Sequence, residues 1–144
     1  MATLGGLRSA AQTAALLEEL VAHWERHAYG LWVFRTNDDD CFVGRAGLRH
    51  VAVAGQPAVE LAYALAAEFW GRGLATEMAR AILTLAFDEL GMPEVVGFTL
   101  PTNRASQRVL SKVGFRFERD IIHADLPHRL YRIARVADRR EAQR

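Results

Sequence analysis

The stretch Glu-Phe-Trp-Gly-Arg-Gly-Leu-Ala-Thr-Glu at residues 68–77 decides how this chain folds. It follows an apolar run at 59–66 that is typical of a buried strand. It leads into residues 74–90, where apolar side chains recur at spacings of three and four, which predicts a helix with one buried face. The sequence therefore predicts a strand, a tight glycine-bearing turn at 68–73, and a helix in succession.

The two glycines of this turn favour a site for an anion. Gly71 and Gly73 have no Cβ atom, so a ligand can approach the backbone closely. The first amides of the following helix lack intrahelical partners, and the helix dipole adds a partial charge of about +0.5 there. These features suit a phosphate or pyrophosphate. Taken alone, the turn is more typical of a plain helix start than of an anion site, and it lacks the Lys-Ser/Thr ending of the nucleotide P-loop.

A second stretch of sequence makes a more specific interpretation of the turn possible. It is Pro-Thr-Asn-Arg-Ala-Ser-Gln-Arg-Val-Leu-Ser-Lys-Val-Gly-Phe at residues 101–115. Together the two stretches resemble the GNAT N-acetyltransferase superfamily, most closely its ribosomal-protein-alanine acetyltransferase (RimJ/RimL-like) branch. The resemblance covers residues 42–133 and implies acetyl-CoA as the co-substrate. It rests on four motifs: Tyr-x-Leu at 63–65, Trp-Gly-x-Gly-x-Ala-Thr-Glu at 70–77, Asn-x-x-Ser-x-x-Val at 103–109 and Lys-x-Gly-Phe at 112–115.

Length and composition predict one globular domain. The chain has 144 residues, of which 51% are hydrophobic and 24% charged, and this is enough to bury a core without disulfides. We expect a single domain over 1–144, with a loose arm at 1–12 and a frayed basic tail at 137–144. The resemblance implies an α/β (α+β) fold with a mixed, mostly antiparallel, twisted sheet flanked by helices.

Periodicity and turn residues predict the other elements of this domain. We expect the strand at 95–100 to run parallel to the strand at 58–66, and glycines to bend the strand at 42–53. The family's first strand and first helix are not found before Thr13, so the N-terminus is apparently shortened. The sheet edge would then need the arm or a second subunit, which makes a homodimer possible. The expected elements are helices at 13–27, 74–90 and 104–113, and strands at 31–35, 42–53, 58–66, 95–100, 115–122 and 130–136.

Charge and cysteine content exclude several classes of protein. The net charge of +1 gives no general reason to expect nucleic acid as a partner. The Arg-rich end at 129–144 is interpreted as a solvated terminus, with RNA binding as the alternative. No segment has the pattern of a signal peptide or membrane span. Cys41 is the only cysteine, which fits a cytoplasmic protein without disulfides. The neighbouring Asp residues should raise the pKa of its thiol, so catalysis by Cys41 is not expected.

The sequence predicts no metal site. His23 and His27 stand four apart in the first predicted helix and could form half of one. No third ligand follows at a useful spacing, so both are interpreted as surface histidines.

The resemblance implies which residues bind acetyl-CoA. The pyrophosphate would lie on the amides of residues 70–75, and Asn103 would hydrogen-bond the pantetheine arm. Glu68 stands where the family usually has Gln or Arg, which removes one cationic contact. Thr76 could add a hydroxyl or be only a capping or exposed surface residue, and Arg108 could meet CoA phosphates or remain solvated. The expected cofactor-binding residues are Leu65, Ala66, Ala67, Trp70, Gly71, Arg72, Gly73, Leu74, Ala75, Thr76, Asn103, Ser106 and Lys112.

Acetyl transfer to an amine needs a proton acceptor for the amine and a proton donor for the departing thiolate. Ser106, the Ser of Asn-x-x-Ser, is the candidate general acid, although a Ser early in a helix can simply bond to the backbone. Glu60 is the candidate general base or a solvent-facing strand residue. Tyr63 is interpreted as cleft wall. In the last hairpin, His123, Asp125 and His128 are expected on the acceptor side.

These inferences predict an acetyl-CoA-dependent N-acetyltransferase. The acceptor would be the N-terminal amine of a protein or a small-molecule amine, acetylated by direct attack in a ternary complex. The alternative is a catalytically silent domain that binds acyl-CoA or another protein. The sequence does not decide between the two kinds of amine.

Overall fold

A computed structural model describes residues 9–135 of the chain, so the predicted basic tail and most of the predicted arm lie outside the described residues. Its centre is a six-stranded sheet with the order β1-β2-β3-β4-β6-β5. Neighbouring strands are antiparallel except β3 and β4, which are parallel as predicted. The strands are β1 (Leu31–Arg35), β2 (Phe42–Val53), β3 (Gln56–Leu65), β4 (Glu94–Thr99), β5 (Arg116–His123) and β6 (Leu126–Ala134).

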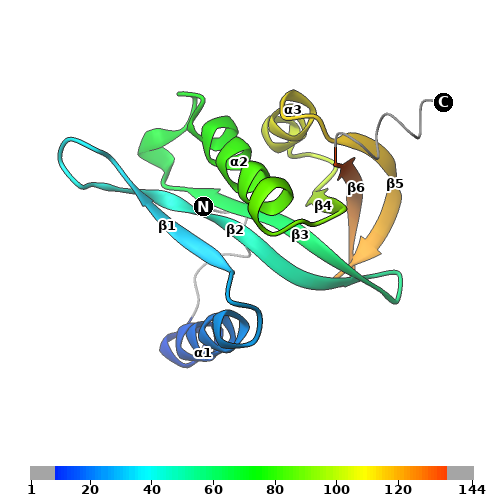
Figure 1. Cartoon of the computed structure of the whole chain (residues 1–144), viewed down its shortest axis with the longest axis horizontal. Helices are drawn as coiled ribbons and strands as arrows, with labels where there is room; N and C mark the ends of the chain where they lie inside the picture. Colours follow the sequence, from blue (N-terminus) through cyan, green and yellow to red (C-terminus); the bar gives the residue numbers. More distant parts are fainter. Residues whose placement is uncertain (1–8, 136–144) are drawn as a thin grey trace.

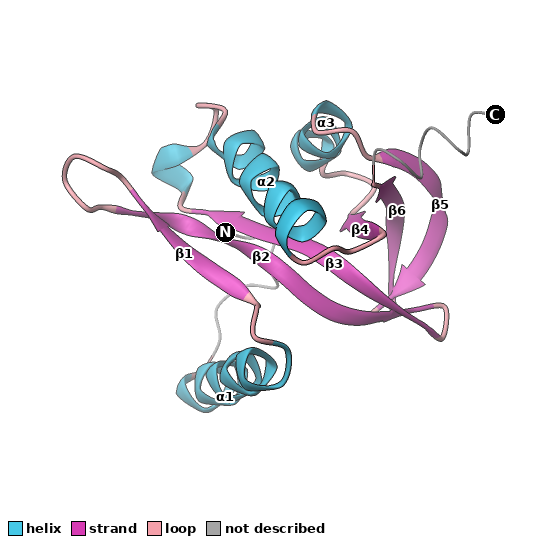
Figure 2. Ribbon diagram, in the orientation of Figure 1, coloured by secondary structure: helices cyan, strands magenta, loops and turns pink. Residues whose placement is uncertain are grey.

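Three α-helices flank this sheet: α1 (Ala10–His27), α2 (Leu74–Thr84) and α3 (Arg104–Lys112). Figures 1 and 2 show α2 and α3 together on one face and α1 on the other side of the sheet, beyond β1. A short 3-10 helix, η2 (Ala67–Phe69), precedes the glycine turn, and a π-helical turn, η3 (Leu85–Glu89), continues α2. The predicted mixed sheet flanked by helices is therefore confirmed. No helix among residues 9–135 is long and apolar enough to cross a membrane.

Some predicted boundaries were wrong for local reasons. The first helix begins at Ala10 rather than Thr13, because Ser9 and Gln12 form a capping box that starts it earlier. The last strand begins at Leu126 rather than Leu130. Its hairpin closes on two residues, Ala124 and Asp125, which both have positive φ. The β2–β3 hairpin closes in the same way on residues 54–55, so β3 begins at Gln56.

The glycines of β2 allow close packing, and the predicted irregularity is found beside Gly44, where the β1–β2 register shifts between Phe34 and Arg35. The register between β2 and β3 is continuous through Gly44 and Gly47. A Cβ atom on Gly47 would lie 1.9 Å from the carbonyl oxygen of Gly30, and one on Gly44 would lie 2.2 Å from that of Ala64. Neighbouring backbone fills the space that a side chain would need.

The main core lies between the sheet and α2. In β3, Leu61 and Leu65 point to this core, and partly buried Tyr63 packs against it. Glu60 lies in register with Val96, which belongs to a smaller apolar cluster with Val53 and Leu130. Strand alternation therefore places Glu60 on the face of the sheet opposite α2. The main core comprises Val43, Ala46, Leu48, Leu61, Leu65, Met78, Ala79, Ile82, Leu83, Ala86, Met92, Val95, Leu110, Phe115, Tyr131 and Ile133.

Helix α1 packs against the sheet through the face that carries Leu16, Leu20 and Trp24, while Leu17 and Val21 are 57% and 56% exposed. The half-buried face includes Trp24, whose indole N–H donates to the Leu31 carbonyl at 3.3 Å and whose ring packs against Trp32. His23 lies on this face too, with Leu16, Leu20 and His27. The expectation that both histidines are simple surface residues is therefore wrong.

We expect Gly47→Ala to lower the free energy of unfolding by about 2 kcal/mol or more, because its methyl group meets backbone that cannot move aside. Urea unfolding monitored by circular dichroism would measure the loss. Gly97→Ala is the control, since the nearest atoms to its Cβ are Leu110 methyl groups at 3.1 and 3.3 Å, on a side chain that can rotate. Equal stability of the two variants would contradict the packing argument.

Candidate active site

The parallel strands β3 and β4 separate shortly after they meet. Their register contains one pair, Glu60 with Val96. Beyond it a cleft of about 1700 Å³ opens, with the end of β3, the start of α2 and one side of α3 along its walls. The antiparallel β5–β6 hairpin borders the other end through His123 and His128. A gap in the middle of the sheet thus connects the two ends of the site.

The predicted anion site on the amides of residues 70–75, the anion cradle, lies at the start of α2 and borders this cleft. Gly71 and Gly73 have φ of 76° and 75°, and a Cβ on either would meet nothing within 4 Å. Gly73 is the N-cap and offers no side-chain hydrogen bond, so side chains do not occupy the first amides of the helix. Thr76, in the first turn, is buried and lines the cleft, so the alternative of an exposed Thr76 is wrong.

One predicted amide is already occupied. The Trp70 N–H donates to the Ala67 carbonyl at 3.1 Å, which closes η2. The Trp70 indole N–H donates to the Leu65 carbonyl at 3.1 Å, while its ring remains 55% exposed. The prediction that Trp70 offers a free amide to a ligand is therefore wrong. The cradle begins at Gly71.

The backbone that follows β3, beside the cradle, is also partly hydrogen-bonded within the protein. The Ala66 N–H donates to the Val43 carbonyl at 2.8 Å, and neither Ala66 nor Ala67 lines the cleft. Across the gap, Thr99 at the end of β4 is buried and lines the cleft, and its hydroxyl has no hydrogen-bond partner in the described structure. An unpaired buried hydroxyl is costly. It therefore marks a position where a ligand amide can bond.

Helix α3 brings its first turn to the same cleft. The Asn103 side chain accepts from the Ser106 amide at 3.1 Å, which confirms Asn103 as a helix cap. The Ser106 hydroxyl lies 2.5 Å from the Tyr63 hydroxyl, and the two form a hydrogen bond between α3 and β3. Tyr63 is thus more than cleft wall, because it holds the predicted acid in place.

Burial raises the pKa of Tyr63 above the ordinary value of a tyrosine, and the hydrogen bond to Ser106 opposes this shift. The phenol is therefore protonated at neutral pH, so the pair contains two hydroxyl protons. A pair of this kind can donate one proton and be resupplied from the second hydroxyl.

The carboxylate of Glu60 is held by an arginine from the neighbouring strand. Arg49 Nη2 lies 3.0 Å from Glu60 Oε2, and the two residues are cross-strand partners in the β2–β3 register. Glu60 is 8% exposed and lines the cleft, so the solvent-facing alternative is wrong. Its other oxygen, Oε1, makes no hydrogen bond among residues 9–135.

The other predicted residues divide into two groups. Arg108, Lys112, His123 and His128 line the cleft, and His123 stacks on Phe98 with ring centroids 4.6 Å apart. The remaining predicted residues do not line it: Arg72, which lies over the Phe69 ring at 5.4 Å, and Asp125, in the hairpin turn.

Cys41 behaves as predicted. Its thiol is exposed, and a hydrogen bond and the charge of Asp39 raise its pKa. A thiol that resists ionisation is a poor nucleophile at neutral pH.

Sequence reasoning missed Arg49, Thr99 and the role of Tyr63. Arg49 and Tyr63 each act through a partner on another element, and Thr99 is distinguished only by its buried, unpaired hydroxyl, so no local motif marks any of them. The only available signal was strand alternation, which places Tyr63 and Glu60 on opposite faces of β3.

Comparisons with known proteins identify similar sequences and a similar fold. A family model described as an acetyltransferase (GNAT) domain matches residues 1–116. An uncharacterized Bacillus subtilis protein, YkkB, is 28% identical over 131 residues, which is 91% of this chain and 76% of YkkB. The FsC-acetyl coenzyme A-N(2)-transacetylase of Aspergillus fumigatus is 35% identical over 92 residues, covering 60% of this chain and 38% of that enzyme. The crystal structure of an acetyltransferase from Agrobacterium tumefaciens superimposes with a TM-score of 0.80 at 24% identity, covering 93% of this chain and 77% of the other.

We expect Ser106→Ala to raise the pKa of Tyr63 further, because it removes the hydrogen bond that lowers this pKa. Absorbance titration near 295 nm of each protein, with and without Tyr63→Phe, isolates the Tyr63 transition. Because the folded pKa exceeds the unfolded value, this group stabilises the fold below about pH 10 and the contribution disappears as pH rises through the folded pKa. An unchanged or lower Tyr63 transition in Ser106→Ala would contradict the assignment of the pair.

Proposed function

Because the chain belongs to the GNAT acetyltransferase family, we propose that it transfers an acetyl group from acetyl-CoA to a primary amine by direct attack in a ternary complex. One observation carries the proposal. A single cleft joins a glycine-bearing helix start, a paired Ser–Tyr hydroxyl couple and a carboxylate held by an arginine. The arrangement offers a candidate group for each of three tasks: placing the two substrates, removing a proton from the amine and donating a proton to the sulfur.

The residues around the cleft fit acetyl-CoA, which when bound supplies the acetyl group as a reactive thioester. The free amides of residues 71–75 suit its pyrophosphate, because they point from a helix start that also favours negative charge. Arg108 and Lys112 provide mobile positive charge on α3. The Thr99 hydroxyl and the amide side chain of Asn103 suit the peptide-like pantetheine arm.

Glu60 is proposed to accept the proton of the attacking amine. An alkylamine with a pKa of about 10 is almost entirely protonated at pH 7, so its reaction needs a proton acceptor. Arg49 fixes one carboxylate oxygen at 3.0 Å and leaves Oε1 free for the amine or for a bridging water. Arg49 is therefore a positioning residue.

Ser106 is proposed to give a proton to the departing sulfur. A serine alone is a weak acid, but its hydroxyl lies 2.5 Å from that of Tyr63. As Ser106 loses its proton, the Tyr63 phenol can replace it through the same hydrogen bond. The carbon–nitrogen bond forms and the carbon–sulfur bond breaks, while the protonated amine loses two protons, one to Glu60 and one to solvent. The sulfur takes the proton of Ser106, Tyr63 resupplies Ser106, and solvent returns a proton to Tyr63.

The acceptor is proposed to approach from the side of the cleft bordered by His123 and His128. Phe98 and His123 offer stacked flat rings there. The N-terminal amine of a protein and a small-molecule amine are both candidate acceptors at this side.

We expect the purified protein to release free CoA from acetyl-CoA in the presence of at least one amine of a panel. The panel would contain a peptide with N-terminal Ala, a polyamine and an aminoglycoside. Ser106→Ala and Glu60→Gln should each lower kcat/KM by about 100-fold or more, the usual effect of losing an acid or base. A thiol reagent would measure the rate, and mass spectrometry would locate the acetyl group.

Ser111→Ala and Glu118→Gln are the matched controls, since neither residue is proposed to act in the reaction. If CoA binds but no amine is acetylated, the alternative of a catalytically silent acyl-CoA-binding domain replaces the proposal. If both catalytic variants retain full activity, the reaction proceeds without these groups.

We expect Gly71→Ala and Gly73→Ala to weaken CoA binding at least 10-fold, because a methyl group would occupy space that a phosphate needs. Both positions have positive φ, so each change should also cost about 1–2 kcal/mol of stability. Gly55→Ala is the control, because Gly55 also has φ of 80° and open space around its Cβ, but lies in the β2–β3 turn. Calorimetric titration with CoA separates strain from loss of the cradle, and equal affinity in all three variants would contradict the proposal.

A further inference from the structure

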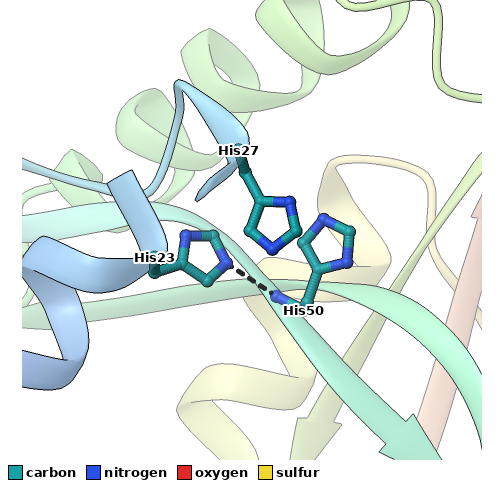
Figure 3. Close-up of side chains that lie close together, drawn as sticks. All are labelled: His23, His27 and His50. Carbon is teal, nitrogen blue, oxygen red and sulfur yellow. Dashed lines mark hydrogen bonds between the residues drawn. The ribbon is translucent and has the colours of Figure 1, made fainter. Parts of the chain in front are cut away.

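Three histidines from two different elements meet on the side of the sheet that carries α1. His23 and His27 come from the last turns of α1, and His50 comes from β2 (Figure 3). Each offers a ring nitrogen, and these nitrogens lie within 4.8 Å of one another. His23 and His27 are half-buried and His50 is exposed. None of the three lines the acetyl-transfer cleft.

Tyr29 orients two of the three rings. Its carbonyl oxygen lies 2.9 Å from His23 Nδ1, and its hydroxyl lies 2.5 Å from His50 Nε2. The His50 backbone N–H donates to His23 Nε2 at 3.0 Å, so the Nδ1 of His23 carries the proton and donates to Tyr29. A histidine whose Nδ1–H is held by a carbonyl presents its Nε2 lone pair in a fixed direction, as metal-binding histidines do.

His27 makes no hydrogen bond among the described residues and stacks on His50, with ring centroids 3.7 Å apart and planes at 8°. The i, i+4 spacing of His23 and His27 sets both rings on one face of α1. Helix α1 ends at Ala28, whose φ of 60° turns the chain. This turn places Tyr29 between the two histidines of α1 and strand β2. The fold therefore supplies the third imidazole that sequence spacing did not.

We propose that His23, His27 and His50 bind one divalent transition-metal ion of the zinc class. Tetrahedral coordination by nitrogen at about 2.0–2.1 Å needs neighbouring nitrogens about 3.3 Å apart. Rotation about the side-chain bonds can close the 4.8 Å spacing to that value. The change frees the His50 backbone N–H from His23, and water can replace this bond because His50 is exposed.

The donor set favours zinc over calcium or magnesium. Three imidazoles suit Zn²⁺, Cu²⁺ and Ni²⁺, whereas Ca²⁺ and Mg²⁺ take oxygen ligands. A cavity of about 180 Å³ borders His23 and His50 and leaves room for a water as the fourth ligand. Bound metal would link the end of α1 to β2, which among the described residues are otherwise joined by the hydrogen bond that the His50 backbone N–H donates to His23 Nε2.

The test uses the full chain without a histidine tag, stripped of metal by a chelator. Titration with Co²⁺ should give visible d–d absorption of a tetrahedral complex that saturates at one ion per chain, and Zn²⁺ should displace it. His27→Gln and His50→Gln should each weaken binding by more than the roughly 10- to 100-fold that loss of a supporting partner costs. Zn²⁺ should raise the Tm of the wild type and leave that of both variants unchanged.

The double variant His123→Gln/His128→Gln is the matched control, because it removes the other histidine pair, whose rings lie 5.6 Å apart. It should bind Co²⁺ as the wild type does. Tyr29→Phe keeps the carbonyl but removes the hydroxyl bonded to His50, and it should weaken binding by about 10-fold or more. The proposal is overturned if the wild type shows no saturable Co²⁺ absorption, or if His27→Gln and His50→Gln bind as tightly as the wild type.

Discussion

The separation of β3 from β4 is the constraint on which the rest of the site depends. Two parallel strands that met along their full length would leave no opening between them, and each amide at their edges would be paired. Here one register pair, Glu60 with Val96, joins them at the start. Helices α2 and α3, which follow β3 and β4 in the chain, lie next to each other on one face of the sheet (Figure 1). The unpaired hydroxyl of Thr99 lies in that opening.

Because of this opening, the two faces of the sheet contribute different groups to the site. Tyr63 points toward α2 and α3, where it meets Ser106, whereas Glu60 points to the other face, where Arg49 holds it. Alternation along one strand therefore keeps the proposed proton donor, the Ser106–Tyr63 pair, apart from the proposed proton acceptor, Glu60. Two such groups on the same face could bond to each other directly. On opposite faces they can act on the same reacting centre only through the gap.

Local patterns in the sequence predicted most of the framework. The bounds of β1 and β2 are as predicted, and Gly71, Gly73, Asn103 and Ser106 all reach one cleft. These features depend on neighbours within a few residues. Arg49, Tyr29 and the meeting of His50 with α1 depend on strand register and helix docking, which no short motif encodes. The prediction of a free Trp70 amide was wrong for a related reason. The Trp70 amide closes η2, a turn that the glycine pattern did not indicate.

The β5–β6 hairpin carries a consequence for how such a protein diversifies. β5 is the last strand of the sheet, pairs only with β6 among the described strands, and has mostly exposed side chains. Exchanging its residues would disturb little of the core, while His123 at its end borders the cleft. Substitutions in this hairpin can therefore change the proposed acceptor side of the cleft, while the opposite wall, built on α2 and α3, is preserved. One scaffold can in this way acquire new acceptors by exchange of a single edge segment.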